Sequence, residues 1–121
     1  MVESYRDLTV WQKAMDLAEM IISLSATLPR EQVYGMSAQM QRSAISVPSN
    51  IAEGHARNST KEYLYHISVS LGSIAELETQ LILCGRVKFL SKDGIREALT
   101  LSDEVGKMLR GIQRGLKEKL N

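Results

Sequence analysis

The chain has 121 residues, of which 44% are hydrophobic and 24% charged, and its formal net charge is +1. This length predicts one domain, residues 1–121, with a single core. Because the net charge is close to zero, the overall charge gives no evidence for a nucleic-acid, membrane or acidic partner. The lone cysteine, Cys84, excludes an internal disulfide, fits a reducing compartment, and is expected to be a small buried hydrophobe. Neither a secretion signal nor an apolar run of ~18 residues is found, so we expect a cytoplasmic protein from a bacterium or archaeon, without membrane contact.

The first helix is expected over residues 9–27. Thr9 is expected to cap its N-terminus, and Pro29 to end it. Its apolar side chains recur at helical spacing and should share one buried face. They are Trp11, Ala14, Met15, Ala18, Ile21, Ile22 and Leu28.

The second helix is expected over residues 37–57. Pro48 lies within it, and its missing N–H and its clash with the Ala44 carbonyl predict a kink or a local break. Gly54 is interpreted as a point of close contact with a neighbouring helix, the alternative being a residue that merely weakens this one. The apolar stripe is Met40, Ala44, Val47 and Ile51.

Two further helices follow. The third should begin at Ser59, which forms a capping box with Glu62, and should end near Gly85. Its stripe is Leu64, Ile67, Leu71, Ile74 and Leu81. The fourth should be capped by Ser91 or Asp93, and its stripe is Ile95, Ala98, Val105, Leu109, Ile112, Leu116 and Leu120. Amphipathic helices joined by short turns predict an all-α, antiparallel, up-down-up-down four-helix bundle.

The second and third helices each carry a separate polar face, roughly 130° from the apolar stripe. If the two helices run antiparallel on either side of Asn58, two residues face each other when their residue numbers add up to nearly the same value. The predicted pairs are Arg57 with Glu62, Glu53 with His66, Asn50 with Ser70, Ser46 with Ser73, Arg42 with Glu76, and Gln39 with Gln80. We name these residues the polar seam. The small residues Ser46, Ser70, Gly72 and Ser73 should let the backbones approach closely.

Two interpretations of the polar seam stay open. It is either partly buried, fixing register or lying where subunits meet, or an exposed face whose ion pairs contribute about 0–1 kcal/mol each. Buried pairs would cost several kcal/mol to break on one side.

These residues carry a family resemblance. The segments DLTVWQKA at 7–14, LPREQVYGMSAQMQRSAISVPSNIAEGHARNSTKEY at 28–63 and SLGSIAELETQL at 70–81 resemble the 23S rRNA intervening-sequence family, named for reading frames inside insertions in bacterial 23S rRNA genes. The segment with Pro48, Asn50, Glu53 and Gly54 is the most diagnostic. The resemblance implies a left-handed up-down bundle and a ring-like homo-oligomer, specifically a pentamer.

Catalytic and metal patterns are not found. The glycines are scattered, no histidine has a glutamate three residues before it, and His55 and His66 are too far apart for a local metal motif. His66 near Glu53 is either an acid–base pair or, as we expect, a structural histidine. We therefore expect no enzyme activity, no cofactor and no metal.

Helix four carries basic residues at spacings of three, four and three, opposite its apolar stripe. They are Lys107, Arg110, Arg114 and Lys117, which we name the basic ridge. It should be about 15 Å long, and it is either a non-specific phosphate-binding surface or a solvated face diluted by Asp103, Glu104 and Glu118. This helix has no aromatic residue, so base stacking there is not expected.

The functional hypothesis is a non-enzymatic, homo-oligomeric scaffold or adaptor that binds RNA or DNA non-specifically through the basic ridge and residues such as Arg30. The alternative is a protein–protein interaction module without nucleic-acid binding. A third hypothesis, an enzyme built on the polar seam, requires an open pocket beside Glu53 or His66.

Overall fold

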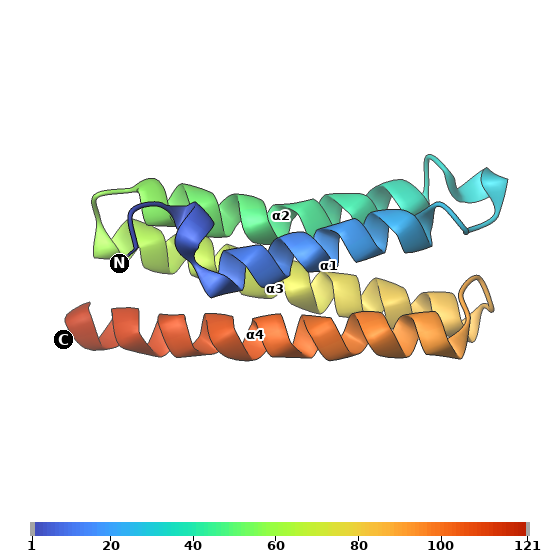
Figure 1. The fold of residues 1–121 in the computed structure, drawn as a ribbon. Coiled ribbons are helices and arrows are strands. Elements are labelled where there is room, and N and C mark those ends of the chain that lie inside the picture. The colour runs from blue at the N-terminus through green and yellow to red at the C-terminus, as the bar shows by residue number, and fades with distance from the viewer. Residues whose placement is uncertain (1, 121) are drawn as a thin grey trace.

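The computed structural model describes residues 2–120, which form four long helices and two short 3-10 helices. The elements are η1 (Tyr5–Asp7), α1 (Thr9–Ser25), η2 (Arg30–Gln32), α2 (Met36–Ala56), α3 (Thr60–Arg86) and α4 (Lys92–Leu120). Successive long helices run in opposite directions, and both chain ends lie at the same end of the bundle (Figure 1). The prediction of an all-α, up-down four-helix bundle is confirmed.

In cross-section, the four long helices lie at the corners of a square. α1 packs on α2 and α4, and α3 packs on the same two helices, whereas within residues 2–120 the diagonal pairs make no backbone contact. Each helix therefore needs one broad apolar face toward the centre, which is the pattern expected of an amphipathic helix in a bundle.

The core follows the predicted stripes, with a few corrections. Met40, Ala44, Val47 and Ile51 of α2 are fully buried. Leu17 and Leu77 are also fully buried, although neither was in a predicted stripe. Placing Met15, Ile22 and Leu120 in the core was wrong, because all three are exposed. Met15 and Ile22 follow the buried Ala14 and Ile21, and the 100° step between successive residues turns them outward.

The N-terminal cap was predicted at the wrong residue. α1 begins at Thr9 itself, and its cap position is Leu8, which makes no side-chain capping bond. The reciprocal capping box lies earlier, on η1. Ser4 Oγ accepts from the Arg6 N–H, and Asp7 Oδ2 accepts from the Ser4 N–H. These bonds satisfy backbone donors ahead of α1.

The ends of α3 match the prediction to within a residue or two. Ser59 is its N-cap and accepts from the Glu62 N–H at 3.1 Å, which is one of the two bonds of the predicted capping box. The helix ends at Arg86, just after Gly85. At the start of α4, the Gly94 N–H donates to Ser91 Oγ, so Ser91 rather than Asp93 supplies the cap.

Pro48 produces no break, because α2 is one continuous helix from Met36 to Ala56. Pro48 is buried and faces α1 beside Trp11. By length and composition alone, α3 is apolar enough to cross a membrane, with a mean hydropathy of 1.3 over its best window. It packs between α2 and α4 with Ile67, Leu77 and Leu81 fully buried, which accounts for that composition.

Candidate functional site

The polar seam lies between α2 and α3, which approach each other closely at Gly54. A Cβ placed on Gly54 would lie 2.7 Å from the Cβ of His66 and 3.0 Å from Cδ1 of Tyr63. The interpretation of Gly54 as a close-contact residue is therefore confirmed. Gly72 was wrongly included among the contact residues, because it is exposed and a Cβ there would meet no atom within 4 Å.

Small hydroxyl groups join the two helices at the middle of the seam. Ser73 Oγ donates to Ser46 Oγ at 2.8 Å, as the predicted pairing requires. Ser70 is fully buried and donates to the backbone carbonyl of Val47 at 2.9 Å. The predicted pairing of Asn50 with Ser70 was wrong, because the seryl hydroxyl is satisfied by the α2 backbone instead.

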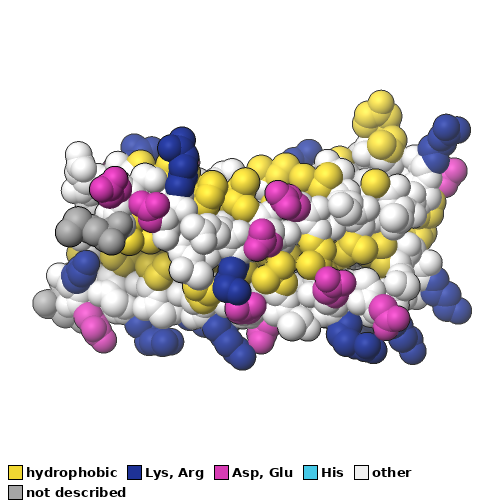
Figure 2. All heavy atoms as spheres, viewed as in Figure 1, with side chains coloured by type: hydrophobic (Ala, Val, Ile, Leu, Met, Phe, Trp, Pro, Cys, Tyr) yellow, Lys and Arg dark blue, Asp and Glu magenta, His cyan; other side chains and the backbone are white. Residues whose placement is uncertain are grey.

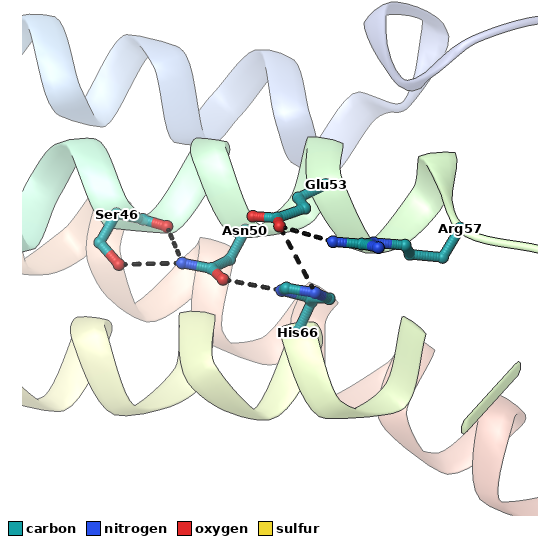
Figure 3. Close-up of polar contacts among 5 residues, drawn as sticks. All are labelled: Ser46, Asn50, Glu53, Arg57 and His66. Atoms are coloured by element: carbon teal, nitrogen blue, oxygen red, sulfur yellow. Dashed lines mark hydrogen bonds and ion pairs between the residues drawn. The ribbon is translucent and has the colours of Figure 1, made fainter. Parts of the chain in front are cut away.

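Asn50 and His66 form the central contact of the seam (Figure 3). Asn50 Nδ2 donates to the Ser46 carbonyl at 2.9 Å, and since a carbonyl only accepts, this bond orients the amide. Asn50 Oδ1 then faces His66 Nδ1 at 2.9 Å. Because an amide oxygen only accepts, Nδ1 carries a proton in this arrangement and donates it to Asn50 Oδ1.

Glu53 lies beside His66 but is bound by Arg57 (Figure 3). Arg57 Nη2 lies 2.9 Å from Glu53 Oε1, whereas His66 Nε2 lies 3.9 Å from the same oxygen. The predicted pair of Arg57 with Glu62 was wrong. Arg57 is the residue that caps the C-terminus of α2, four positions after Glu53, and an acid four positions ahead of a base is the favoured order for such a pair.

The remaining predicted pairs are also corrected. Among residues 2–120, Arg42 makes no ion pair with Glu76; Glu76 Oε1 instead accepts from Ser43 Oγ at 2.9 Å. Ser43 follows Arg42 by one residue, so its side chain is turned by 100° toward α3 while Arg42 stays exposed. Gln80 is buried, Gln39 is exposed, and Gln80 Oε1 has no hydrogen-bond partner in the described chain.

Burial divides the seam into two parts. Ser70, Ser73 and Gln80 are buried, as is Ser43 beside the seam, and Ser46, Asn50 and His66 are partly buried. The charged members are exposed, namely Arg42, Glu53, Arg57, Glu62 and Glu76. The hydroxyl and amide groups therefore fix how α2 and α3 pack, while the charges lie along the rim, where exposed pairs contribute little.

Two features of the described seam bear on acid–base and metal chemistry. The 3.9 Å separation of His66 Nε2 and Glu53 Oε1 is too long for a hydrogen bond. Within residues 2–120, no three His, Cys, Asp or Glu side chains are grouped to hold a metal ion. Burial raises the pKa of the Tyr63 hydroxyl beside Gly54 and also raises the pKa of the Cys84 thiol.

Sequence analysis missed the polar contacts on the other sides of the bundle. Ser102 of α4 is fully buried and donates to Glu78 Oε2 of α3 at 2.9 Å. Gln41 Nε2 of α2 donates to Ser25 Oγ of α1 at 2.8 Å. Ser102 lies on the helix-four stripe between Ala98 and Val105, so its spacing was the available signal.

The basic ridge lies along the exposed side of α4. Lys107, Arg110, Arg114 and Lys117 are all exposed. Lys107 Nζ pairs with Asp103 Oδ2 at 3.2 Å, and it is the one ridge residue with an ion pair in the described chain. Figure 2 shows Lys and Arg side chains at intervals along the α4 edge, with acidic side chains among them.

An apolar groove separates α1 from α2 on the outside of the bundle. Its volume is about 360 Å³. Its apolar lining includes Trp11, Met15, Ile22, Ile45 and Pro48, and Tyr5 packs edge-on against Trp11 at 5.3 Å between ring centroids. Hydrophobic side chains are visible over this part of α1 and α2 in Figure 2. Glu19 is the one acidic or basic side chain in the lining of this groove.

Comparisons with known proteins agree with this architecture. The sequence model of the family described as "23S rRNA-intervening sequence protein" matches residues 6–111. A crystal structure of a protein of unknown function from the S23 ribosomal protein family of Bacteroides thetaiotaomicron is similar, with a TM-score of 0.82 and 27% sequence identity. The similarity covers 87% of this chain and 98% of that one. No curated protein matches the chain. This four-helix chain therefore belongs to the 23S rRNA-intervening sequence protein family.

Proposed function

We propose that the protein is a non-enzymatic, homo-oligomeric scaffold that binds RNA or DNA non-specifically through the basic ridge of α4. The observation that carries self-association is the exposed apolar groove between α1 and α2. Ile22 and Ile45, which flank it, are 43% and 46% exposed. A contiguous exposed apolar surface of this kind is typical of a protein–protein interface.

A second apolar surface supports association into a closed ring. Ile82, Leu83 and Val87, at the C-terminal end of α3, are 44–49% exposed. They share no residue with the groove, which lies between α1 and α2. Two different patches on one chain suit a head-to-tail interface, in which the patch of one copy covers the groove of the next. Such an interface gives a closed ring when the rotation between copies closes on itself, and an open filament when it does not.

The basic ridge supports the nucleic-acid part of the proposal. Three of its residues, Arg110, Arg114 and Lys117, lack an acidic partner in the described chain. Repeated in every copy of a ring, the ridge offers many phosphate contacts at once. The binding should therefore weaken steeply with salt and show little sequence preference.

Light scattering tests the self-association. The family resemblance suggests a pentamer, so we expect a mass near five times the 13.5 kDa chain. Ile45→Gln and Ile82→Gln should each reduce this mass, while Val2→Gln, which removes an exposed apolar side chain from the N-terminal segment, should not. A monomeric wild-type protein would show that the ring is wrong.

Salt-dependent binding tests the ridge. The double variant Arg110→Glu, Arg114→Glu should lose most of its affinity for duplex RNA. The dependence of the remaining affinity on salt should become shallower, because the variant neutralises fewer phosphates and releases fewer counterions. Equal affinity of this variant and the wild type would exclude the ridge as the binding surface.

The alternative is a protein–protein interaction module that recruits a different protein through the α1–α2 groove. It predicts a wild-type protein with no affinity for nucleic acid and a salt-independent complex that Ile45→Gln disrupts. A cytoplasmic location accords with either proposal, since Cys84 is a buried free thiol.

A further inference from the structure

The end of the bundle that carries the α1–α2 and α3–α4 connections is more basic than the rest of the chain. Residues 26–36 and 86–96 hold five basic and two acidic side chains, a local net charge of +3, compared with +1 for the whole protein. Both connections lie at the end opposite the two chain ends (Figure 1), and Lys and Arg side chains are visible around it in Figure 2. Because the whole chain carries +1, the residues outside these two ranges carry −2, so a polyanion is attracted to this end more than to the rest of the chain.

Lys88, in the α3–α4 connection, occupies a position that favours glycine. Its φ is 64°, in the left-handed region, and it is the one non-glycine residue with positive φ in the described chain. The Phe89 N–H donates to the Cys84 carbonyl at 2.8 Å, and the Lys88 N–H donates to the Gly85 carbonyl at 3.2 Å. These bonds form a Schellman motif, in which the left-handed residue is usually glycine. A lysine there costs backbone stability and places a cation at the basic end, which suggests a use for the charge.

Tyr34, in the α1–α2 connection, is 95% exposed. The segment around it is nevertheless held by hydrogen bonds. The Val33 N–H donates to the Arg30 carbonyl, the Gly35 N–H donates to the Gln32 carbonyl, and the Met36 N–H donates to Gln32 Oε1. The backbone that carries the ring is therefore ordered before any partner binds. An exposed aromatic ring carried by an ordered backbone is a platform on which a nucleobase can stack.

We propose that this end of the bundle binds a single-stranded segment of RNA or DNA. The phosphates lie against the exposed side chains of Arg30, Lys88 and Lys92, and one unpaired base stacks on Tyr34. The site differs from the basic ridge in having an aromatic ring, so it distinguishes unpaired from paired strands, which the ridge does not. It lies apart from the ridge and does not depend on the ridge being a binding surface.

The same features are less suited to an anionic membrane. Val33 and Tyr34 are the two exposed large hydrophobic residues of the α1–α2 connection. Ile82, Leu83 and Val87 are also exposed near this end, but they form the patch that the proposed ring covers, so few apolar side chains are left to insert into a membrane. Three dispersed cations beside a single ring match a chain of phosphates with one stacked base more closely.

Fluorescence anisotropy with an oligouridine of about 12 nucleotides, and with an RNA duplex of the same length, tests the stacking. Tyr34→Ala should weaken binding of the single strand by about 5- to 100-fold and leave duplex binding unchanged. Tyr34→Phe should retain the wild-type affinity. The matched control is Tyr65→Ala, which removes an exposed tyrosine near the opposite end of the bundle and should change neither affinity.

The variant Lys88→Gly tests the charge with two opposite readouts. It should raise the melting temperature by about 2–4 °C, because glycine adopts the left-handed conformation without strain. It should also lower the affinity for oligouridine and reduce the slope of log K against log salt by about 0.7, the amount expected for one phosphate contact on a single strand. Lys61→Ala, which removes one charge from the opposite end, should alter neither the affinity nor the slope.

Three results would overturn the proposal. In the first, Tyr34→Ala leaves oligouridine affinity unchanged; in the second, it weakens single-strand and duplex binding equally. In the third, the wild type binds phosphatidylserine vesicles but not oligouridine, which would assign this end to a membrane. Arg110→Glu, Arg114→Glu reports on the ridge separately, so failure of one site is distinguishable from failure of the other.

Discussion

Gly54 on α2 and His66 on α3 lie so close that a single added carbon at Gly54 would be 2.7 Å from the Cβ of His66. The Cβ of His66 is bonded directly to the backbone of α3. The Tyr63 carbonyl oxygen, which would lie 3.4 Å from the added carbon, is itself a backbone atom. Neither can move without shifting α3 itself. The contact between these two helices therefore depends on the absence of a side chain at one position, and it sets where Asn50 meets His66.

Gly54→Ala should destabilise the protein by about 1–3 kcal/mol, since α2 and α3 must separate to accommodate the methyl group. Chemical denaturation monitored by circular dichroism measures the change. Gly72→Ala is the matched control, because this glycine lies in α3 with no atom within 4 Å of an added Cβ. It should stabilise the protein by about 0.5–1 kcal/mol through helix propensity. If both substitutions stabilise it, the close approach at Gly54 does not exist in solution.

Asn50→Ala should cost about 1–3 kcal/mol, because His66 Nδ1–H loses its acceptor where the side chain is only 12% exposed. Ser49→Ala, at the exposed neighbouring position, should lie within about 0.5 kcal/mol of wild type. Imidazole ¹⁵N chemical shifts give a second, independent measurement. They should show the Nδ1–H tautomer of neutral His66 in the wild type, and an Nε2–H tautomer would contradict the arrangement.

Thermodynamic coupling separates the observed partner of Glu76 from the expected one. Ser43→Ala and Glu76→Ala should couple by about 0.5–1 kcal/mol in a double-mutant cycle, since the hydroxyl donates to the carboxylate. Arg42→Ala and Glu76→Ala should be additive within about 0.5 kcal/mol. Strong coupling of Arg42 with Glu76 would show that these two side chains form the ion pair predicted from the sequence.

The N-terminal turn should be sensitive to acid. Backbone N–H groups of Glu3 and Ser4 donate to Asp7 and lower the pKa of its carboxyl below the ordinary value. Because the pKa is lower in the folded state, the stabilisation is present above the unfolded-state pKa and is lost as the pH falls through the folded-state pKa. Amide NMR shifts of Glu3 and Ser4 should therefore titrate below the ordinary aspartate range. In Asp7→Asn this titration should vanish, and its persistence would show that another group causes it.

Cys84 should react slowly with thiol reagents. Its side chain is fully buried, its sulfur lies 3.7 Å from the Met40 sulfur, and burial raises the pKa of its thiol. Labelling by a thiol-reactive disulfide at mildly alkaline pH should follow unfolding of the bundle and accelerate sharply in denaturant. Rapid stoichiometric labelling of the native protein would show that the α3 core opens locally.

Periodicity predicted the helices well because their physics is local. The stripe from Met40 to Ile51 is completely buried, and Ser59 caps α3 where its hydroxyl can reach the Glu62 N–H. The missed features depend on rotation and distance across helices. Met15 and Ser43 each lie one residue from a position of opposite burial, so a 100° rotation decides whether a side chain faces solvent or the neighbouring helix.

The amino-acid sequence by itself determined four amphipathic helices, their turns and their order, because apolar spacing and capping residues act over a few neighbouring positions. The tertiary structure alone decided which polar groups meet. Arg57 binds Glu53 of the helix that it caps, and Ser43 takes the place expected for Arg42. The connections that carry Tyr34 and Lys88 lie at one end of the bundle, although 54 positions separate these two residues in sequence. Such contacts depend on the approach and rotation of whole helices, which Gly54 and the buried seryl hydroxyls set together.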